Sequence, residues 1–232
     1  MAELEGRIAL VTGATRGLGH AVSRALAAQG AHVVALGRTQ GALEELDDAI
    51  SAAGGAATLT PLDIRDDPAL ERLGAALNQR WGRLDLLVHC AAEAAPMAPA
   101  EHVAAADLDK AIAVDFRAVQ RLIRVLHPLL KAAPAAQAVF VDDPDTAGAA
   151  FLGAYGAAKA AARTLALSYA AEQARRGPRI WLAAPPPMPT AVRARFRPGE
   201  DRATLAPTAD VAERLVAKIV AGEAAPGETV RL

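Results

Sequence analysis

One stretch of the chain combines a tyrosine, a lysine and several acidic side chains at spacings that suit proton transfer. In "VDDPDTAGAAFLGAYGAAK" (141–159), Tyr155 lies four residues before Lys159. Residues four apart share one face of a helix, and a neighbouring ammonium makes a phenol more acidic. Asp142, Asp143 and Asp145 lie just upstream and carry the opposite charge. The stretch therefore predicts a tyrosine–lysine proton-transfer site, either working or disabled by the aspartates.

A second stretch has the glycine spacing of a phosphate-binding turn. "TGATRGLG" (12–19) joins an apolar run to a helical pattern and places glycines at Gly13, Gly17 and Gly19. Glycine allows a tight turn and lets a pyrophosphate approach the N–H groups of a helix closely. Between a strand and a helix, this spacing predicts a dinucleotide site. The competing interpretation is a tight turn that binds no ligand.

The end of the second apolar run bears on which dinucleotide would bind. "ALGRT" (35–39) carries Gly37 and Arg38 where a carboxylate would select the ribose 2′-hydroxyl of NAD(H), and Arg16 lies in the glycine turn. Two guanidinium groups would bind a 2′-phosphate in a bidentate manner. We therefore favour NADP(H) and keep NAD(H) as possible. The alternative is that both arginines simply face solvent.

The elements that must position these residues alternate along the whole chain. Short, nearly continuous apolar runs predict strands buried on both faces of a parallel sheet, and the segments between them have helical periodicity. This alternation predicts an α/β fold, a doubly wound parallel β-sheet with helices on both faces, in a single domain over 1–232. The predicted strands are 7–13, 32–37, 56–63, 84–90, 137–142, 179–184 and 227–232, and the predicted helices are 18–29, 41–53, 67–80, 103–130, 153–176 and 208–221.

Composition excludes several classes of function. The 232 residues are 53% hydrophobic and 22% charged, with a formal net charge of −1, so no global attraction to nucleic acid or to anionic membranes is expected. The N-terminus lacks the pattern of a signal peptide, and no apolar run reaches the length of a membrane span. One cysteine and scattered histidines give no metal-binding spacing. We expect a cytoplasmic, soluble protein without a metal site.

The glycine turn and the Tyr155–Lys159 pair together resemble the short-chain dehydrogenase/reductase family, whose members have a single Rossmann-type NAD(P)-binding domain. The resemblance covers essentially the whole chain. It implies that Asp63 lies against the adenine and that Thr190 contacts the cofactor beyond the sixth strand. The cofactor-binding residues that it implies are Gly13, Thr15, Arg16, Gly17, Leu18, Gly19, Arg38, Asp63, Ile64, Ala91, Tyr155, Lys159 and Thr190.

In this family a tyrosine, with its pKa lowered by the lysine, exchanges a proton with the substrate oxygen, while the nicotinamide exchanges a hydride with the carbon. The resemblance implies that Tyr155 is the acid/base and Lys159 its activator. Four family positions differ in this chain. The serine that holds the substrate oxygen aligns with Asp142, the asparagine of the long helix aligns with Asp115, Asn-Asn-Ala-Gly reads His89-Cys90-Ala91-Ala92, and Pro-Gly reads Pro185-Pro186.

Asp142 is the most serious departure. An ionised carboxylate cannot donate a hydrogen bond to a carbonyl, and at ~4 Å with an effective dielectric near 20 it opposes a tyrosinate by about 4 kcal/mol. Asp142 would have to be protonated, or to point away and leave the substrate to Thr146 or a backbone N–H. Asp115 could pair with Lys159. The alternative is that "DDPD" is only a solvated turn.

A short segment over 188–207 is expected to form the substrate-side loop. Its Arg193, Arg195 and Arg197 could bind an acidic substrate, although a solvated basic loop is favoured. The segments 103–130 and 153–176 carry many apolar and small residues, and the family resemblance implies that these helices pair across a twofold axis, so we expect a homodimer or homotetramer. The function expected is NADP(H)-dependent hydride transfer between nicotinamide and a carbonyl or secondary alcohol of a small-molecule substrate. The alternatives are a cofactor-binding protein without reductase activity and, more remotely, a structural subunit that binds no nucleotide.

Overall fold

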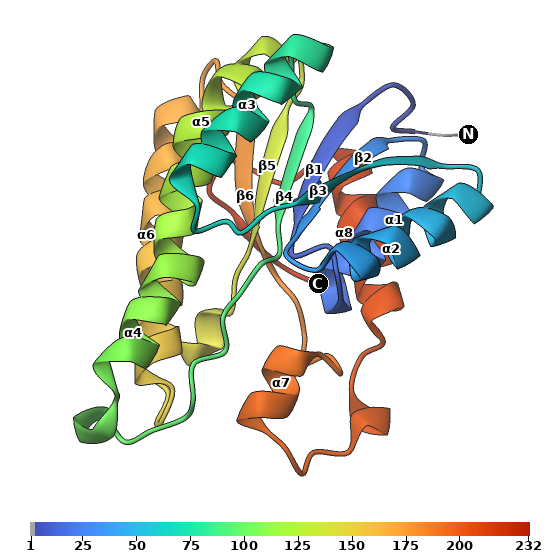
Figure 1. The fold of residues 1–232 in the computed structure, drawn as a ribbon. Helices are drawn as coiled ribbons and strands as arrows, with labels where there is room; N and C mark the ends of the chain where they lie inside the picture. The colour runs from blue at the N-terminus through green and yellow to red at the C-terminus, as the bar shows by residue number, and fades with distance from the viewer. Residues whose placement is uncertain (1–2) are drawn as a thin grey trace.

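The computed structural model describes residues 3–232, which form an α/β fold around one seven-stranded parallel sheet (Figure 1). The strand order is β3-β2-β1-β4-β5-β6-β7, and every neighbouring pair is parallel. This order confirms the doubly wound sheet predicted from the sequence. The strands are β1 (Ile8–Thr12), β2 (His32–Gly37), β3 (Ala56–Pro61), β4 (Leu86–His89), β5 (Gln137–Val141), β6 (Arg179–Ala184) and β7 (Thr229–Arg231).

Helices cover both faces of the sheet, as Figure 1 shows. Helices α1, α2 and α8 bury their apolar sides on one face, whereas α3, α5 and α6 bury theirs on the other. The central strands are accordingly buried along their whole length, which explains their continuous apolarity. The helices are α1 (Gly17–Ala28), α2 (Gln40–Ala52), α3 (Asp67–Trp81), α4 (Ala105–Ala111), α5 (Ala118–Ala132), α6 (Gly153–Gln173), α7 (Ala191–Phe196) and α8 (Thr208–Ala221).

Two segments differ from the sequence prediction. The single helix expected over 103–130 is α4 and α5 joined by a π-helical segment, Ile112–Arg117, in which the backbone widens by one residue per turn. Periodicity in the sequence continues through such a bulge, so it gives no warning of it. The segment 188–207, expected to be a loop, contains α7, which Thr190 caps by accepting a hydrogen bond from the Arg193 N–H at 3.2 Å.

Candidate active site

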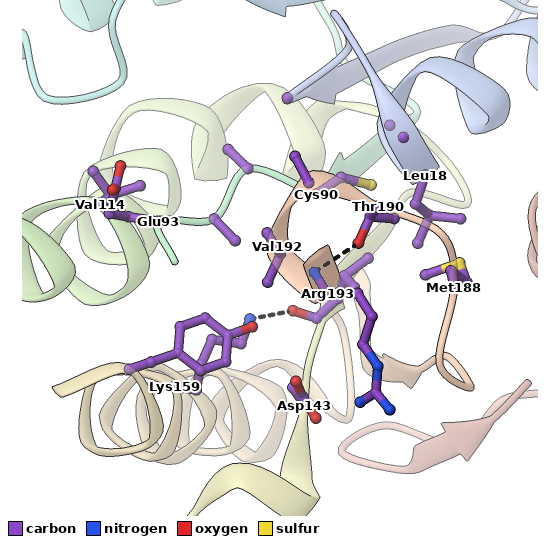
Figure 2. A pocket seen from close by; sticks show the side chains of 18 of the residues that line it. Leu18, Cys90, Glu93, Val114, Asp143, Lys159, Met188, Thr190, Val192 and Arg193 are labelled. Carbon is purple, nitrogen blue, oxygen red and sulfur yellow. Dashed lines mark hydrogen bonds between the residues drawn. The ribbon is translucent and has the colours of Figure 1, made fainter. Parts of the chain in front are cut away.

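A cavity of about 510 Å³ opens at the carboxyl ends of the strands, between the glycine turn after β1 and the start of α6. Strand order reverses between β1 and β4, so the loops that leave these two strands diverge and leave a crevice between them. The turns after β1, β2, β4, β5 and β6 all contribute residues to the lining. Figure 2 shows the side chains that converge there.

The glycine turn is shaped for close approach by another group. Gly13 has φ 69°, and a Cβ there would lie 2.9 Å from the backbone of Ala91. A Cβ on Gly19 would lie 2.3 Å from the Gly13 carbonyl oxygen. No side chain caps the N-terminus of α1, which begins at Gly17. The turn therefore fits a pyrophosphate at the start of this helix, where N–H groups and the helix dipole favour an anion.

Around this turn lie the other residues predicted to contact the cofactor. Thr190 approaches the turn, since a Cβ on Gly17 would lie 3.4 Å from its Cγ2 atom. Leu18 and Ile64 are buried side chains of the lining. The cavity lining includes all of the predicted cofactor residues, namely Gly13, Thr15, Arg16, Gly17, Leu18, Gly19, Arg38, Asp63, Ile64, Ala91, Tyr155, Lys159 and Thr190.

At the end of β2 the packing leaves no room for an acidic side chain. A Cβ on Gly37 would lie 2.4 Å from Cγ2 of Thr15, so any larger residue would displace the threonine. Arg16 and Arg38 are exposed on the cavity lining and form no ion pair within residues 3–232. The nearby carboxylate of Asp63 pairs with Arg65 at 2.7 Å and not with Arg16 or Arg38, and the hydrogen bond from Arg65 lowers the pKa of the Asp63 carboxyl. Two guanidinium groups are therefore available for a 2′-phosphate.

Tyr155 and Lys159 lie on the first two turns of α6, and both are buried. The Lys159 Nζ donates a hydrogen bond of 2.6 Å to the Val141 carbonyl oxygen, shown as a dashed line in Figure 2. The Tyr155 ring packs against Phe196 of α7, with ring centroids 5.0 Å apart. Burial raises the pKa of Tyr155 well above 10, and the charges of nearby aspartates raise it further. This direction is opposite to the lowering that the family mechanism implies.

Asp142 is buried, and its carboxylate turns toward α6. Its Oδ2 accepts a hydrogen bond from Nε of Arg163 at 2.6 Å and lies 2.5 Å from Nη2 of the same side chain. The Asp142 N–H donates a hydrogen bond to the carbonyl oxygen of Ala183, a residue of the neighbouring strand β6. The carboxylate predicted to hold the substrate oxygen is therefore engaged by an arginine.

Asp143 is the acidic residue that sequence reasoning missed. It is half-buried and lines the cavity, and it belongs to none of the ion pairs in the described part of the chain. Among the charges that raise the pKa of Tyr155, that of Asp143 has the largest effect. Desolvation raises the pKa of Asp143 itself, Asp142 and Asp145 add to this, and Lys159 and Arg193 oppose it. The acidic run itself was the available signal, because Asp142, Asp143 and Asp145 all line the cavity.

Asp115 lies in the π-helical segment and is almost completely buried. Its Oδ1 accepts a hydrogen bond of 3.0 Å from the Glu93 N–H, whereas Oδ2 is buried without a hydrogen-bond partner. Desolvation raises the pKa of Asp115 to about 7, although the Lys159 charge opposes this. The pairing suggested for Asp115 and Lys159 is absent among the ion pairs of residues 3–232, since the lysine is bonded to Val141 instead.

Other residues singled out in the sequence have structural partners. His89 Nδ1 and Thr12 Oγ1 lie 2.8 Å apart, and burial lowers the pKa of His89 to about 3. Arg193 forms a bidentate pair with Glu200, at 2.5 and 2.6 Å, and lines the cavity with Arg197. Arg195 is absent from the lining. Thr146 donates its hydroxyl proton to the Asp143 carbonyl oxygen at 2.7 Å, so that proton is unavailable to a substrate.

Two general expectations can be compared with the described residues. Over 3–232, no group of three or more His, Cys, Asp or Glu side chains is placed to hold a metal ion. Within the same range, none of the helices combines the length and apolarity that a membrane crossing requires.

Part of the chain is similar in sequence to curated dehydrogenases. A curated NADP-dependent 3-hydroxy acid dehydrogenase from Shigella flexneri is 35% identical over 121 residues, which is 52% of this chain and 48% of that protein. A 2,3-dihydro-2,3-dihydroxybenzoate dehydrogenase from Bacillus subtilis is 40% identical over 88 residues, 38% of this chain and 34% of that protein. The matches thus span at most about half the length of these two relatives.

Solved structures match over the full length. A structure from Pseudomonas syringae has a TM-score of 0.94 at 32% identity, covering 99% of this chain and 96% of the other. A structure from Shigella flexneri in complex with NADP has a TM-score of 0.93 at 26% identity, covering 99% and 98%. The profile of the short chain dehydrogenase family matches residues 7–201. The chain therefore belongs to the short-chain dehydrogenase family.

Proposed function

We propose that this protein is an NADP(H)-dependent oxidoreductase that exchanges a hydride between nicotinamide and the carbon of a carbonyl or secondary alcohol. The observation that carries the proposal is one cavity lined both by the glycine turn and by Tyr155 and Lys159. Further support comes from relatives, because one curated relative is an NADP-dependent dehydrogenase and one similar structure contains NADP.

The chain offers a separate group of residues for each part of the cofactor. The glycine turn and the start of α1 would hold the pyrophosphate, and Arg16 and Arg38 would bind the 2′-phosphate. Thr190 and Lys159 would hold the nicotinamide half. The bound cofactor would supply the hydride. NADP(H) is favoured over NAD(H) because the strand end at Gly37 has no carboxylate and no room for one.

The charges around Tyr155 favour reduction as the working direction. Burial and three aspartates raise the pKa of Tyr155, so the phenol keeps its proton near neutral pH and is a proton donor rather than a base. A donor is what carbonyl reduction requires, because the substrate oxygen must gain a proton as the carbon gains a hydride. Asp143, rather than Asp142, is our candidate for the residue beside the substrate heteroatom.

The same electrostatics support a second candidate function. Developing negative charge on a substrate oxygen would be opposed by any ionised aspartate at this site. A cofactor-binding protein without appreciable reductase activity, acting as a sensor or assembly partner, would tolerate these carboxylates. The observation that favours this candidate is that Asp142 and Asp143 line the same cavity as the buried Tyr155.

Binding and turnover separate the two candidates. Thermal unfolding with NADPH and with NADH tests cofactor binding, and absence of stabilisation by either would refute both. NADPH oxidation over a panel of carbonyl compounds then tests for reductase activity. Tyr155→Phe should abolish oxidation while NADPH still binds. Tyr169→Phe is the matched control, because Tyr169 is the other tyrosine of the chain and bonds His127 at 2.9 Å outside the cavity lining.

We also propose that the protein is a homodimer or homotetramer. Helices α5 and α6 form the outer layer of one face of the sheet in Figure 1, and Leu167 of α6 is an exposed large apolar residue. Small and apolar residues along two neighbouring helices suit pairing across a twofold axis. Light scattering at micromolar concentration tests this, and a monomer would refute it.

A further inference from the structure

Asp143 differs from the other acidic side chains that line the cavity, because each of those has a cationic partner. Asp143 takes part in no ion pair or side-chain hydrogen bond in the part of the chain that the structure describes. The carboxylate is therefore available to a bound molecule. The paired acids are Asp63 with Arg65, Glu93 with Lys110, Asp142 with Arg163 and Asp145 with Arg231.

The carboxylate of Asp143 lies close to the proposed proton donor. Its charge acts on Tyr155 more strongly than that of any other residue, and it lines the same cavity. Figure 2 shows its carboxylate oxygens in the region between Lys159 and Arg193, and both cations influence it electrostatically. Neither cation forms an ion pair with Asp143, because Lys159 donates to the neutral Val141 carbonyl and Arg193 is paired with Glu200. The carboxylate of Asp143 thus contributes negative potential to the cavity that Tyr155 also lines.

This potential distinguishes between two kinds of double bond. When a carbonyl accepts a hydride, negative charge develops on its oxygen, and a neighbouring carboxylate opposes that change. A protonated imine carries a positive charge before it accepts the hydride and becomes neutral afterwards. A carboxylate attracts this cation, and the N–H group of the cation can donate a charge-assisted hydrogen bond to it. The site therefore suits a nitrogen cation better than a carbonyl oxygen.

We propose that Asp143 is a subsite for a protonated nitrogen, and that the substrates of this enzyme are imines bound as iminium ions. The proposal rests on the proposed function for its cofactor and hydride, and it changes the acceptor from C=O to C=N. The hydride joins the imine carbon, and the π electron pair of the C=N bond becomes the lone pair of nitrogen. Iminium and NADPH thus give a neutral amine and NADP⁺. The amine then takes a proton from water.

The rest of the lining indicates an apolar body for the substrate. Phe196, Val192, Leu152 and Met97 line the cavity, and the first three cluster with Tyr155, whose ring packs directly against Phe196. These side chains would bury hydrocarbon, whereas Asp143 would bind the charged nitrogen. A cyclic imine fused to an apolar ring meets both requirements.

A binding measurement that involves no turnover tests the subsite. NADPH and NADP⁺ binding is measured first, because its absence would refute the proposed function itself. Calorimetry at saturating NADP⁺ then compares tetrahydroisoquinoline, a cation at pH 7, with isochroman, its neutral oxygen analogue of the same shape. We expect the cation to bind at least about tenfold more tightly, as a charge-assisted hydrogen bond provides. Equal binding would overturn the inference while leaving the cofactor assignment intact.

Two variants test whether Asp143 causes the preference for the cationic ligand over its neutral analogue. Asp143→Asn keeps the shape and removes the charge, so the preference for the cation should fall to about onefold. Asp109→Asn is the control, because Asp109 is an exposed aspartate of α4 outside the cavity lining. An unchanged preference in Asp143→Asn would overturn the inference. The wild-type comparison needs no variant, so the test stands even if Asp143→Asn does not fold.

Turnover provides an independent result. With NADPH, the wild type should reduce 3,4-dihydroisoquinoline with a kcat/KM at least about tenfold above that for 2-tetralone, a ketone of similar size. Asp143→Ser should reverse this order, because a hydroxyl donates to a carbonyl and has no charge to attract an iminium. Preferential reduction of 2-tetralone by the wild type would overturn the inference and support the carbonyl function. If NADPH binds but neither compound reacts, the inference is also refuted.

Discussion

The carboxyl of Asp115 lies inside the protein with one oxygen unpaired, and it provides a direct test of the electrostatics of this site. Oδ1 accepts the Glu93 N–H, while Oδ2 is buried without a partner. Asp115→Asn keeps the shape of the side chain and the acceptor for this N–H, but it removes the ionisable group. We predict that this variant is more stable than the wild type at pH 8 and equally stable near pH 4.

The magnitude follows from the pKa shift. Desolvation raises the pKa of Asp115 from 3.8 to about 7, so the folded protein holds this proton over a pH range in which the unfolded chain has lost it. Stability is therefore lost as pH rises from about 4 to about 7. About three pKa units correspond to a loss of about 4 kcal/mol above pH 7. No discount for solvent screening applies, because Asp115 is 1% exposed.

Asparagine resembles the protonated acid, because each places a neutral donor group, an NH2 or an O–H, where Oδ2 lies. The cost of that donor, about 1–3 kcal/mol, is thus shared by both proteins at low pH and cancels in the comparison. Above pH 7 only the wild type carries the buried charge. The difference in the free energy of unfolding should grow from about zero at pH 4 to about 4 kcal/mol at pH 8.

Urea denaturation of the apoprotein at pH 4, 5, 6, 7 and 8 measures this difference. Asp109→Asn, at an exposed position of the adjoining helix α4, is the control and should show no such trend. A difference between Asp115→Asn and wild type that stays constant with pH would refute the reasoning. A variant that becomes less stable than wild type at pH 8 would show instead that attraction to Lys159 outweighs desolvation.

Three further changes test other parts of the site. Gly13→Ala should abolish stabilisation by NADPH, because its Cβ would lie 2.9 Å from the Ala91 backbone, and wild-type stabilisation would contradict this. Arg38→Ala should weaken NADPH by roughly tenfold and leave NADH unchanged in titrations, so equal losses would argue against a 2′-phosphate contact. Arg163→Met should lower the free energy of unfolding in urea by about 3–5 kcal/mol, because it leaves the carboxylate of Asp142 buried and unpaired. Adding Asp142→Asn to this variant should recover most of the lost stability, and no recovery would refute the pairing.

Much of the fold could be predicted because it depends on local, repeated signals. Strands buried on both faces are apolar along their length, and the helices between them alternate apolar and polar sides, so element order follows from the sequence. The glycine turn was predictable for a steric reason. Gly13 and Gly19 lie where any Cβ would collide with backbone, and the spacing of such residues is visible in the sequence.

The errors arose where tertiary contacts decide the structure. The π-helical segment keeps an apolar periodicity close to that of an α-helix, so the widening that carries Asp115 inward leaves no mark in the sequence. Helix α7 is six residues long, and although its Thr190 cap is a local signal, the packing of Phe196 against Tyr155 joins residues far apart in the sequence and could not be predicted. The predicted oxygen-holding residue, Asp142, was chosen by counting from Tyr155, and a count cannot show which way a side chain points.

The two adjacent aspartates after β5 are best understood as a pair in which one fixes the other. Arg163 on α6 holds the carboxylate of Asp142, which also lies on the cavity lining, and the Asp142 N–H is bonded to the Ala183 carbonyl oxygen of β6. These two bonds fix the residue next to Asp143, whose carboxylate lines the same cavity without an ion pair in the described part of the chain. Breaking the Asp142–Arg163 pair should therefore disturb the site as well as the stability. If Arg163→Met loses stability but keeps the wild-type preference of the protein for a cationic over a neutral ligand, Asp143 is positioned by something other than its neighbour.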